Sequence, residues 1–527
     1  MELTRSSGVL LHPTSLPGPY GIGELGDVAY KFIDFLAEAR QSLWQILPLG
    51  PTGYGDSPYA SFSSFAGNPL LISLDWLVLE GDLDISDLSN RPVFSIDQVD
   101  YGSVITWKVP LLEKAAKTFL KHAKANRQAD FEAFCARHAH WLDDYALFMA
   151  VKQTFDRHAI EANIFGAMWN NYWDKSIALR QREAVVRWQT EQADAIVVHK
   201  TLQFFFFQQW DALKKYANKK GIRIIGDIPI FVAPDSADVW ANRDLFQLDR
   251  QGRPKVVAGV PPDYFSLTGQ LWGNPLYDWQ ALEAQNFDWW VKRVEGALHF
   301  VDILRIDHFR GFEAYWEIPA GEKTAIKGKW VKAPGNTFFK ALQAALGELP
   351  IIAEDLGVIT QPVIAMRERF GFPGMRVLQF AFDANEAGSS GATNSFLPHN
   401  FDQHTVVYTG THDNDTTRGW YDKRTESERD LVRRYLARDG NDIAWDFIRL
   451  ALSSTAAFAI IPFQDALNLG SNARMNTPST LGGNWVWRYR PDALSWWVAN
   501  RLAEMVNLYG RDPQIWKIEA PEETEKT

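Results

Sequence analysis

The chain has 527 residues, of which 46% are hydrophobic, enough for one large domain or several ordinary ones. Its formal net charge of -10 is spread without runs of lysine or arginine, which argues against nucleic acid and anionic membrane surfaces as partners. The single cysteine, Cys135, excludes an internal disulfide framework, and no apolar run is long enough to cross a bilayer. We therefore expect a globular, cytoplasmic protein.

Eight short apolar segments along the chain are predicted to form strands. Polar or glycine-containing sequence follows each of them, and helical patterns lie between several. The strand segments are residues 8–12, 43–49, 223–232, 300–307, 350–354, 376–382, 405–411 and 457–464. The helical patterns include residues 27–39, 202–217, 287–298 and 336–346. Strands that alternate with helices in this number predict an α/β fold, the (β/α)8 or TIM barrel.

Long segments between the predicted strands indicate insertions into the barrel. The gap of residues 51–200 is too long for a loop and contains helical patterns at 111–124 and 141–154, so it is predicted to form a mainly helical subdomain. The segment 233–290 leaves the barrel at the end where such folds carry their active sites. It is predicted to cover a cleft.

The part of the chain after the eighth predicted strand is short. Residues 494–509 have a helical pattern, so the barrel with its insertions is predicted to span residues 1–510. A β-sandwich domain is not expected after it, because too few residues remain. The charged residues 511–527 are predicted to form a disordered tail.

Acidic residues concentrate at the ends of four predicted strands. Asp227 lies in the third strand, Asp307 ends the fourth, Glu354 and Asp355 end the fifth, and Asp413 follows the seventh. An acid in a barrel strand is costly unless it lies at the rim, where catalytic groups are found. We therefore predict that these strand ends form the active site.

The fourth strand offers a nucleophile. Arg305 and Asp307 are two residues apart and share a face of the strand, so the guanidinium can hold the Asp307 carboxylate ionised. A purely structural ion pair is the alternative. Chemistry at an acetal carbon needs two carboxyl groups in opposed protonation states, and an acid of the fifth strand can supply the second. The residues alone do not choose between Glu354 and Asp355, because the register of that strand is not fixed.

A metal site is an alternative interpretation of the same region. His308, His412, Asp413 and Asp415 together could hold a divalent ion. Asn414 and the neighbouring threonines are more typical of hydrogen bonds to a sugar, and the sequence contains no zinc-hydrolase motif. A glycine-rich phosphate loop is also missing, which argues against nucleotide-dependent transfer. We expect no metal and no other cofactor.

Several motifs resemble one known family in order and over nearly the whole chain. They are LHPTSLPGPY at 11–20, LPLGPTGYGDSPY at 47–59, PPDYF at 261–265, WGNPLY at 272–277, ARMN at 473–476 and the acid motifs. This set resembles glycoside hydrolase family 77 of the alpha-amylase clan, the amylomaltases or disproportionating enzymes. The resemblance implies a 4-alpha-glucanotransferase that moves segments of maltodextrin or amylose to the 4-hydroxyl of an acceptor glucose or maltooligosaccharide by a retaining double displacement.

The resemblance also implies roles for individual residues. Asp307 would attack the anomeric carbon, Glu354 would be the general acid and base, and Asp413 would stabilise the transition state. It thereby selects Glu354 over Asp355 for catalysis. The implied substrate contacts are Tyr59, Asp227, Arg305, His308 and His412 around the cleaved glucose, and Ser57, Gln270, Trp272, Asp355, Asp383 and Asn476 in neighbouring positions.

Two further glucan contacts are implied by the same resemblance. Asp263, Tyr264 and Phe265 lie in a loop, residues 259–270, that would overhang the cleft and shape acceptor binding. Tyr54 and Tyr101 match positions associated in some family members with a second glucan site, although Tyr54 lies close to a cleft motif and could simply support it.

Two other functions use the same residues. The carboxylates would make the protein a retaining alpha-glucan hydrolase if water reached the intermediate in place of an acceptor sugar. A non-catalytic glucan-binding protein is the second alternative, and the intact set of acids argues against it.

Overall fold

The structure is a computed structural model that describes residues 3–263, 266–383, 391–480 and 482–516. Its centre is an 8-stranded parallel sheet in the order β10-β11-β12-β1-β2-β3-β6-β9. The strands are β1 (Ser6–Leu10), β2 (Leu43–Gln45), β3 (Arg223–Pro229), β6 (Ile303–Asp307), β9 (Ile351–Ala353), β10 (Gly374–Val377), β11 (Thr405–Tyr408) and β12 (Phe458–Pro462). The Ala353 amide donates to the Pro373 carbonyl at 2.9 Å, so the two edges meet and the barrel is nearly closed. The predicted barrel is confirmed.

The barrel strands are short apolar runs because both of their faces are covered. All five residues of β1 and of β12 are buried, as are all residues of β9 and β11. Parallel strands covered in this way read as continuous apolar segments without alternation. This is why the eight strands could be located in the sequence.

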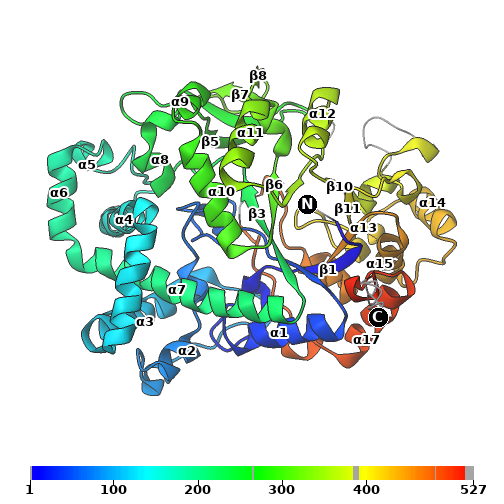
Figure 1. The fold of residues 1–527 in the computed structure, drawn as a ribbon, viewed down its shortest axis with the longest axis horizontal. Helices are drawn as coiled ribbons and strands as arrows, with labels where there is room; N and C mark the ends of the chain where they lie inside the picture. Colours follow the sequence, from blue (N-terminus) through cyan, green and yellow to red (C-terminus); the bar gives the residue numbers. More distant parts are fainter. Residues whose placement is uncertain (1–2, 264–265, 384–390, 481, 517–527) are drawn as a thin grey trace, which may run out of the picture.

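Helices surround the barrel and cover its outer face (Figure 1). They are α1 (Asp27–Glu38), α7 (Ala193–Lys219), α10 (Asp288–Phe300), α11 (Gly335–Leu346), α12 (Gln361–Arg369), α13 (Thr417–Asp422), α14 (Glu426–Leu436), α15 (Ile443–Ser453), α16 (Phe463–Ala466) and α17 (Trp496–Leu508). In α1, Phe32, Ile33 and Leu36 are fully buried, and the Phe32 ring contacts Trp44 of β2 edge-on at 5.3 Å. Helix and strand thus bury their apolar faces against each other.

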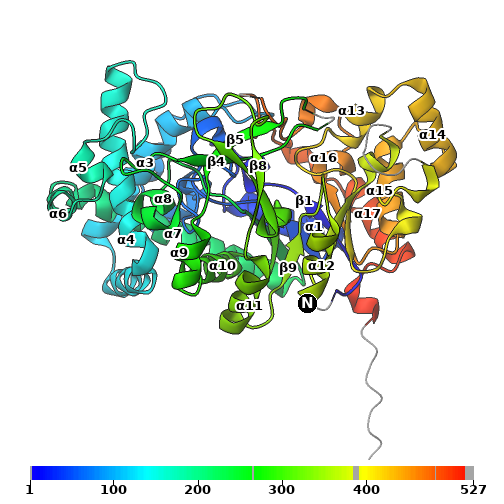
Figure 2. The same ribbon diagram turned by 90° about the horizontal axis from the view of Figure 1, so that it is seen from above.

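The helical insertion lies on one side of the barrel, opposite α13 and α14 (Figure 2). It contains α2 (Leu74–Leu79), α3 (Tyr101–His122), α4 (Ala125–Glu161), α5 (Lys175–Ala178) and α6 (Arg182–Glu191). Its predicted end at residue 200 falls inside α7, which runs without interruption from Ala193 to Lys219. Phe204, in the middle of α7, packs against Phe119 of α3 and Phe134 of α4.

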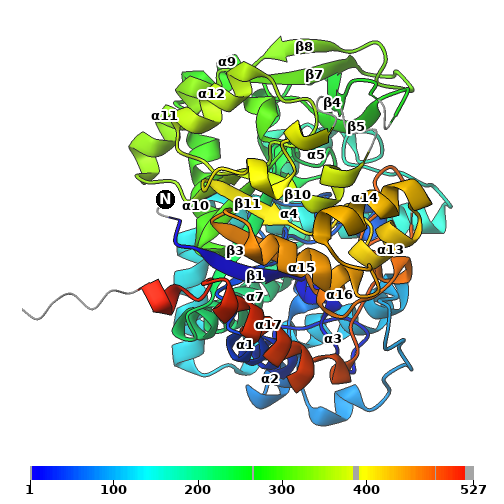
Figure 3. The same ribbon diagram turned by 90° about the vertical axis from the view of Figure 1, so that its right-hand side faces the viewer.

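A second sheet lies beside the barrel and was not predicted (Figure 3). Its strands are β4 (Val256–Val260), β5 (Gln270–Pro275), β7 (Ala314–Pro319) and β8 (Lys329–Lys332), in the antiparallel order β5-β4-β7-β8. The predicted covering segment, 233–290, also contains α8 (Ala237–Ala241) and α9 (Trp279–Ala284) and overlaps the start of α10. The sheet joins this segment to the loop after β6, which the prediction had left separate.

The fold continues beyond residue 510, where the barrel was predicted to end. The Arg511 side chain is fully buried and donates to carbonyls that include those of Ser6 and Leu452. Residues 511–516 are therefore ordered, and residues 517–527 of the predicted tail lie outside the described residues. Within the described part, no strand follows β12, and no helix has the length and apolar character needed to cross a membrane.

Candidate active site

Arg305 stands between two carboxylates at the ends of adjacent barrel strands. In the register of β3 and β6 it lies opposite Asp227, and its Nη1 is 2.5 Å from Asp227 Oδ2. Its Nη2 is 3.0 Å from Asp307 Oδ1. The guanidinium and Asp227 are buried, whereas the Asp307 side chain is 32% exposed. The arrangement holds one face of the Asp307 carboxylate in place and leaves it accessible to a ligand.

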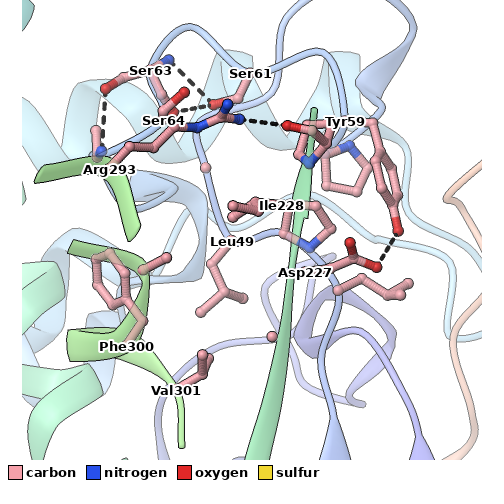
Figure 4. Close-up of a pocket in the computed structure, with 18 of the residues that line it drawn as sticks. Leu49, Tyr59, Ser61, Ser63, Ser64, Asp227, Ile228, Arg293, Phe300 and Val301 are labelled. Carbon is pink, nitrogen blue, oxygen red and sulfur yellow. Dashed lines mark hydrogen bonds between the residues drawn. The ribbon is translucent and has the colours of Figure 1, made fainter. Parts of the chain in front are cut away.

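An aromatic wall adjoins these carboxylates. The Tyr59 hydroxyl donates to Asp227 Oδ2 at 2.9 Å (Figure 4), and the Tyr59 ring stacks on His412 with centroids 5.0 Å apart. Trp485 packs against both rings, at 5.9 and 5.6 Å. Burial raises the pKa of Asp227 to about 7 despite the pull of Arg305. Asp227 Oδ1 is buried and has no hydrogen-bond partner in the described part of the chain.

A cavity of about 70 Å³ lies beside Tyr59 and Asp227 (Figure 4). Its walls are apolar at Leu49 and Ile228 and polar at Ser63. It shows that the space around Asp227 is not completely filled by side chains.

Glu354 follows β9 and is buried. The amides of His308 and Leu356 donate to its two carboxyl oxygens, each at 2.7 Å. Burial and the nearby Asp307 charge raise the pKa of Glu354 to about 8, against the effect of Arg305 and the two amides. The protonated form of Glu354 is thereby favoured, which is the form that a proton donor to an acetal oxygen needs.

Asp355 lies in the seam where the barrel closes, and its predicted contact with substrate stays a prediction. The Met375 amide donates to Asp355 Oδ1 at 2.7 Å, and Arg367 and Arg376 lie within 3.6 and 3.8 Å of Oδ2. The carboxylate is buried by these contacts. Successive residues of an extended strand point in opposite directions, so Asp355 joins β9 to β10 while Glu354 meets the His308 amide.

Asp413 is held in a loop at the end of β11. The Asn476 side chain donates to its Oδ1 at 2.6 Å, and the Arg474 guanidinium donates to its backbone carbonyl at 2.5 Å. His412 Nε2 is 3.4 Å from Asp413 Oδ2. Burial lowers the pKa of His412. The loop thus presents a carboxylate and an imidazole together.

Asp465 is bonded to residues on both sides of this loop, and its supporting role was not predicted from the sequence. It is buried and accepts hydrogen bonds from the Thr409 hydroxyl at 2.6 Å and the Thr417 amide at 2.7 Å. The bonds join β11 to the start of α13, which brackets Asp413. The signal that could have identified Asp465 is an acidic residue shortly after β12, at the end of an apolar run.

The metal interpretation finds no support in the geometry. Asp415 is turned to Lys423 at 2.6 Å and to the Ser471 hydroxyl at 2.7 Å. Among the described residues, no group of three or more His, Cys, Asp or Glu side chains is arranged to hold an ion.

His308 and Trp272 form a second aromatic contact. His308 has a left-handed backbone, with φ of 53°, and its ring meets Trp272 edge-on at 4.8 Å. Burial lowers the pKa of His308 to about 3, so its ring is neutral at neutral pH. Trp272 Nε1 donates to Gln270 Oε1 at 3.2 Å. The second sheet thereby brings β5 against the loop that follows Asp307.

Among the remaining predicted contacts, Ser57 is bonded to Tyr59 of the aromatic wall, whereas Asp263 and Asp383 have partners elsewhere. Ser57 Oγ accepts from the Tyr59 amide, Asp263 Oδ1 accepts from the Ser266 amide, and Asp383 lies 3.7 Å from Arg424. Tyr264 and Phe265 lie outside the described residues. Binding of substrate by these five residues stays a prediction.

The predicted second glucan site at Tyr54 and Tyr101 is corrected at Tyr101. That residue is only 6% exposed, and its hydroxyl donates to the Trp485 carbonyl at 3.0 Å. It therefore offers no ring face to a sugar and instead supports the aromatic wall. The side chain of Tyr54 lies outside the described part. Trp485, which no motif had marked, has a left-handed φ of 62°.

Comparisons with known proteins show the family of the chain. The family model described as 4-alpha-glucanotransferase, glycoside hydrolase family 77, matches residues 11–494. The 4-alpha-glucanotransferase of Synechocystis sp. is 53% identical over 511 residues, 96% of this chain and 98% of the relative. That of Thermus thermophilus is 52% identical over 503 residues, 94% and 97% of the two chains. The solved amylomaltase of Streptococcus agalactiae in complex with acarbose has a TM-score of 0.91 and 41% identity, and the match covers 96% of this chain and 99% of that chain.

Proposed function

The chain belongs to the 4-alpha-glucanotransferase family, and we propose that it transfers segments of alpha-1,4-glucan from maltodextrin or amylose to the 4-hydroxyl of glucose or a maltooligosaccharide. The observation that carries the proposal is the pairing of an accessible Asp307, oriented by Arg305, with a buried and protonated Glu354. The expected place of action is the cytoplasm, whose reducing conditions suit a chain with a single cysteine.

In the first step, an Asp307 oxygen attacks the anomeric carbon. The bond from that carbon to the leaving glucan breaks, and the Glu354 proton passes to the departing oxygen. Asp307 is now an uncharged ester, so its Coulombic effect on Glu354 is lost. The pKa of Glu354 falls as a result, which prepares its carboxylate to act as a base.

In the second step, the acceptor 4-hydroxyl gives its proton to Glu354 and attacks the anomeric carbon. The bond to Asp307 breaks, and the enzyme returns to its starting state with the anomeric configuration retained. Asp413, His412 and Asp227 are proposed to bind hydroxyls of the reacting glucose, a role their hydrogen-bonding groups support. Water in place of the acceptor would give hydrolysis.

The assay that tests this function uses maltotriose as both donor and acceptor. Transfer produces glucose and longer maltodextrins while the number of reducing ends stays constant. Hydrolysis adds one reducing end per event. A steady rise in reducing ends equal to the glucose released would overturn transfer in favour of the hydrolase, and binding without any product would favour a non-catalytic protein.

The roles of the two acids are tested by substitution. We expect Asp307→Asn to form no glycosyl-enzyme detectable by mass spectrometry. Glu354→Gln should lose at least about a hundredfold in rate with maltotriose but recover part of it with a maltosyl fluoride, because fluoride leaves without a proton. Asp355→Asn is the matched control, and a similar recovery by fluoride in that variant would contradict the assignment of Glu354.

A further inference from the structure

Two tryptophans are exposed side by side on the outer flank of the barrel. Trp496 and Trp497 begin α17, which lies next to α15 (Figure 3), and they are 75% and 56% exposed. A cavity of about 280 Å³ opens beside Trp497. Exposed aromatic groups beside a hollow mark interaction sites on soluble proteins.

Trp497 is fixed in position although much of its surface is open. Its ring meets the buried Trp445 edge-on at 5.9 Å, and the Arg501 guanidinium lies 5.1 Å from its centroid. Arg501 is itself held by an ion pair with Asp442 and by the Trp445 ring, 4.1 Å away. A ring held by its neighbours loses little freedom when a ligand stacks on it.

The cavity lining mixes apolar and polar side chains, and none of its described residues carries a positive charge. Asp442, Asp492, Asn468 and Ser495 contribute carboxylates, an amide and a hydroxyl beside the Trp497 ring. The carboxylates disfavour an anionic ligand. A ring with an apolar face and a rim of uncharged hydroxyls, a pyranose, suits both the tryptophan and the acceptors around it.

The cavity is connected through the chain to the catalytic loop. Asn468, in its lining, begins a segment in which Ser471 donates to Asp415 at 2.7 Å and Asn476 donates to Asp413 at 2.6 Å. The cavity therefore borders the start of the segment that supports Asp413. A polymer held there would stay near the barrel end that carries the acids.

We propose that the cavity beside Trp497 is a separate glucan-binding site, in which one pyranose of an alpha-1,4-glucan stacks on Trp497 and the chain continues over Trp496. The proposal rests on the proposed function for the identity of the sugar. It differs in place from the second site predicted at Tyr54 and Tyr101. Its effect is to raise the local concentration of long donors without contacting the reacting glucose.

The experiment compares the wild type with a Trp496→Ala/Trp497→Ala variant on short and long substrates. The kcat/KM for maltotriose should remain within about twofold. The KM for amylose should rise, and retention in a native gel containing amylose should weaken, by about two- to tenfold for the loss of an aromatic contact. Phe165→Ala, which removes an exposed aromatic ring on the distant helical insertion, is the control and should change neither quantity.

Equal KM and equal retention on amylose in the variant and the wild type would overturn the site. Failure of the wild type to disproportionate maltotriose would instead refute the proposed function, so the two failures are distinguishable. If loss of the Trp445 contact lowers the melting temperature of the double variant, Trp496→Ala/Asp492→Ala replaces it, because both side chains are exposed. The same expected and contradicting results apply to that variant.

Discussion

Burial and the nearby Asp307 affect the pKa of Glu354 more than its two hydrogen bonds do. Two backbone amides favour the ionised form, yet burial and the Asp307 charge outweigh them and raise its pKa. The neighbouring Asp355 is also buried, but two arginines and an amide surround it. Adjacent acids thus differ in their surroundings, because Glu354 lies near Asp307 and Asp355 lies in the barrel seam.

The raised pKa of Glu354 predicts the basic limb of the pH profile. A general acid acts in its protonated form, which is present below its pKa and is lost as the pH rises through it. We therefore expect kcat/KM for maltotriose to fall around pH 8, the pKa that burial and Asp307 give to Glu354. The measurement is kcat/KM against pH at constant ionic strength.

Glu354→Gln with a maltosyl fluoride donor serves as the control for that limb. Its first step needs no proton from residue 354, so its rate of glycosyl-enzyme formation should lack the basic decline. A decline with the same midpoint in this variant would assign the limb to another group.

At the scale of elements, a hydrogen bond from α3 of the helical insertion supports the aromatic wall of the site. Tyr101 begins α3, and its hydroxyl holds the carbonyl of Trp485, whose ring packs on Tyr59 and His412. We expect Tyr101→Phe to leave that carbonyl unsatisfied at a cost of about 1–3 kcal/mol and to raise the KM for maltotriose severalfold as the wall loosens. Thermal unfolding and steady-state kinetics measure the two effects.

Tyr145→Phe is a matched substitution in the same insertion. Tyr145 is buried, and its hydroxyl interacts with Gln203 in α7, away from the aromatic wall. A loss of stability without a change in KM is the expected result. If Tyr145→Phe and Tyr101→Phe raise the KM equally, the hydrogen bond to Trp485 has no special role.

The same elements explain what the sequence could and could not predict. The barrel strands were recognisable because buried parallel strands are continuous apolar runs, and the acids marked their ends. The second sheet could not be recognised in the sequence. Its strands β4 and β7 lie in separate insertions, and their register depends on the folded barrel. Tyr101 was misassigned because a motif match carries no information about burial. Trp485 could not be identified from the sequence, because a turn in the folded chain, with a left-handed backbone at Trp485, places its ring against Tyr59.

At the scale of the whole molecule, a buried ion pair fastens the helical insertion to the barrel. Lys108 of α3 is 0% exposed and pairs with Glu24, which precedes α1. Its ammonium also donates to the Leu70 carbonyl at 2.7 Å, and the Leu74 amide donates to Glu24 at 3.3 Å. The pair thus gathers α3, the start of α2 and the N-terminal part of the barrel around one buried ion pair.

Removing one member of this pair should be far more damaging than removing both. Lys108→Met leaves the Glu24 carboxylate buried without its partner, and we expect a loss of about 3–5 kcal/mol in the free energy of unfolding. The double variant Glu24→Met/Lys108→Met should recover most of that loss, because two apolar chains replace two desolvated charges. Equilibrium denaturation at one pH measures both.

Lys292→Met, which breaks the exposed pair with Asp288, is the control and should cost at most about 1 kcal/mol. A double variant no more stable than Lys108→Met would show that packing around the pair, not its charge, fastens the insertion.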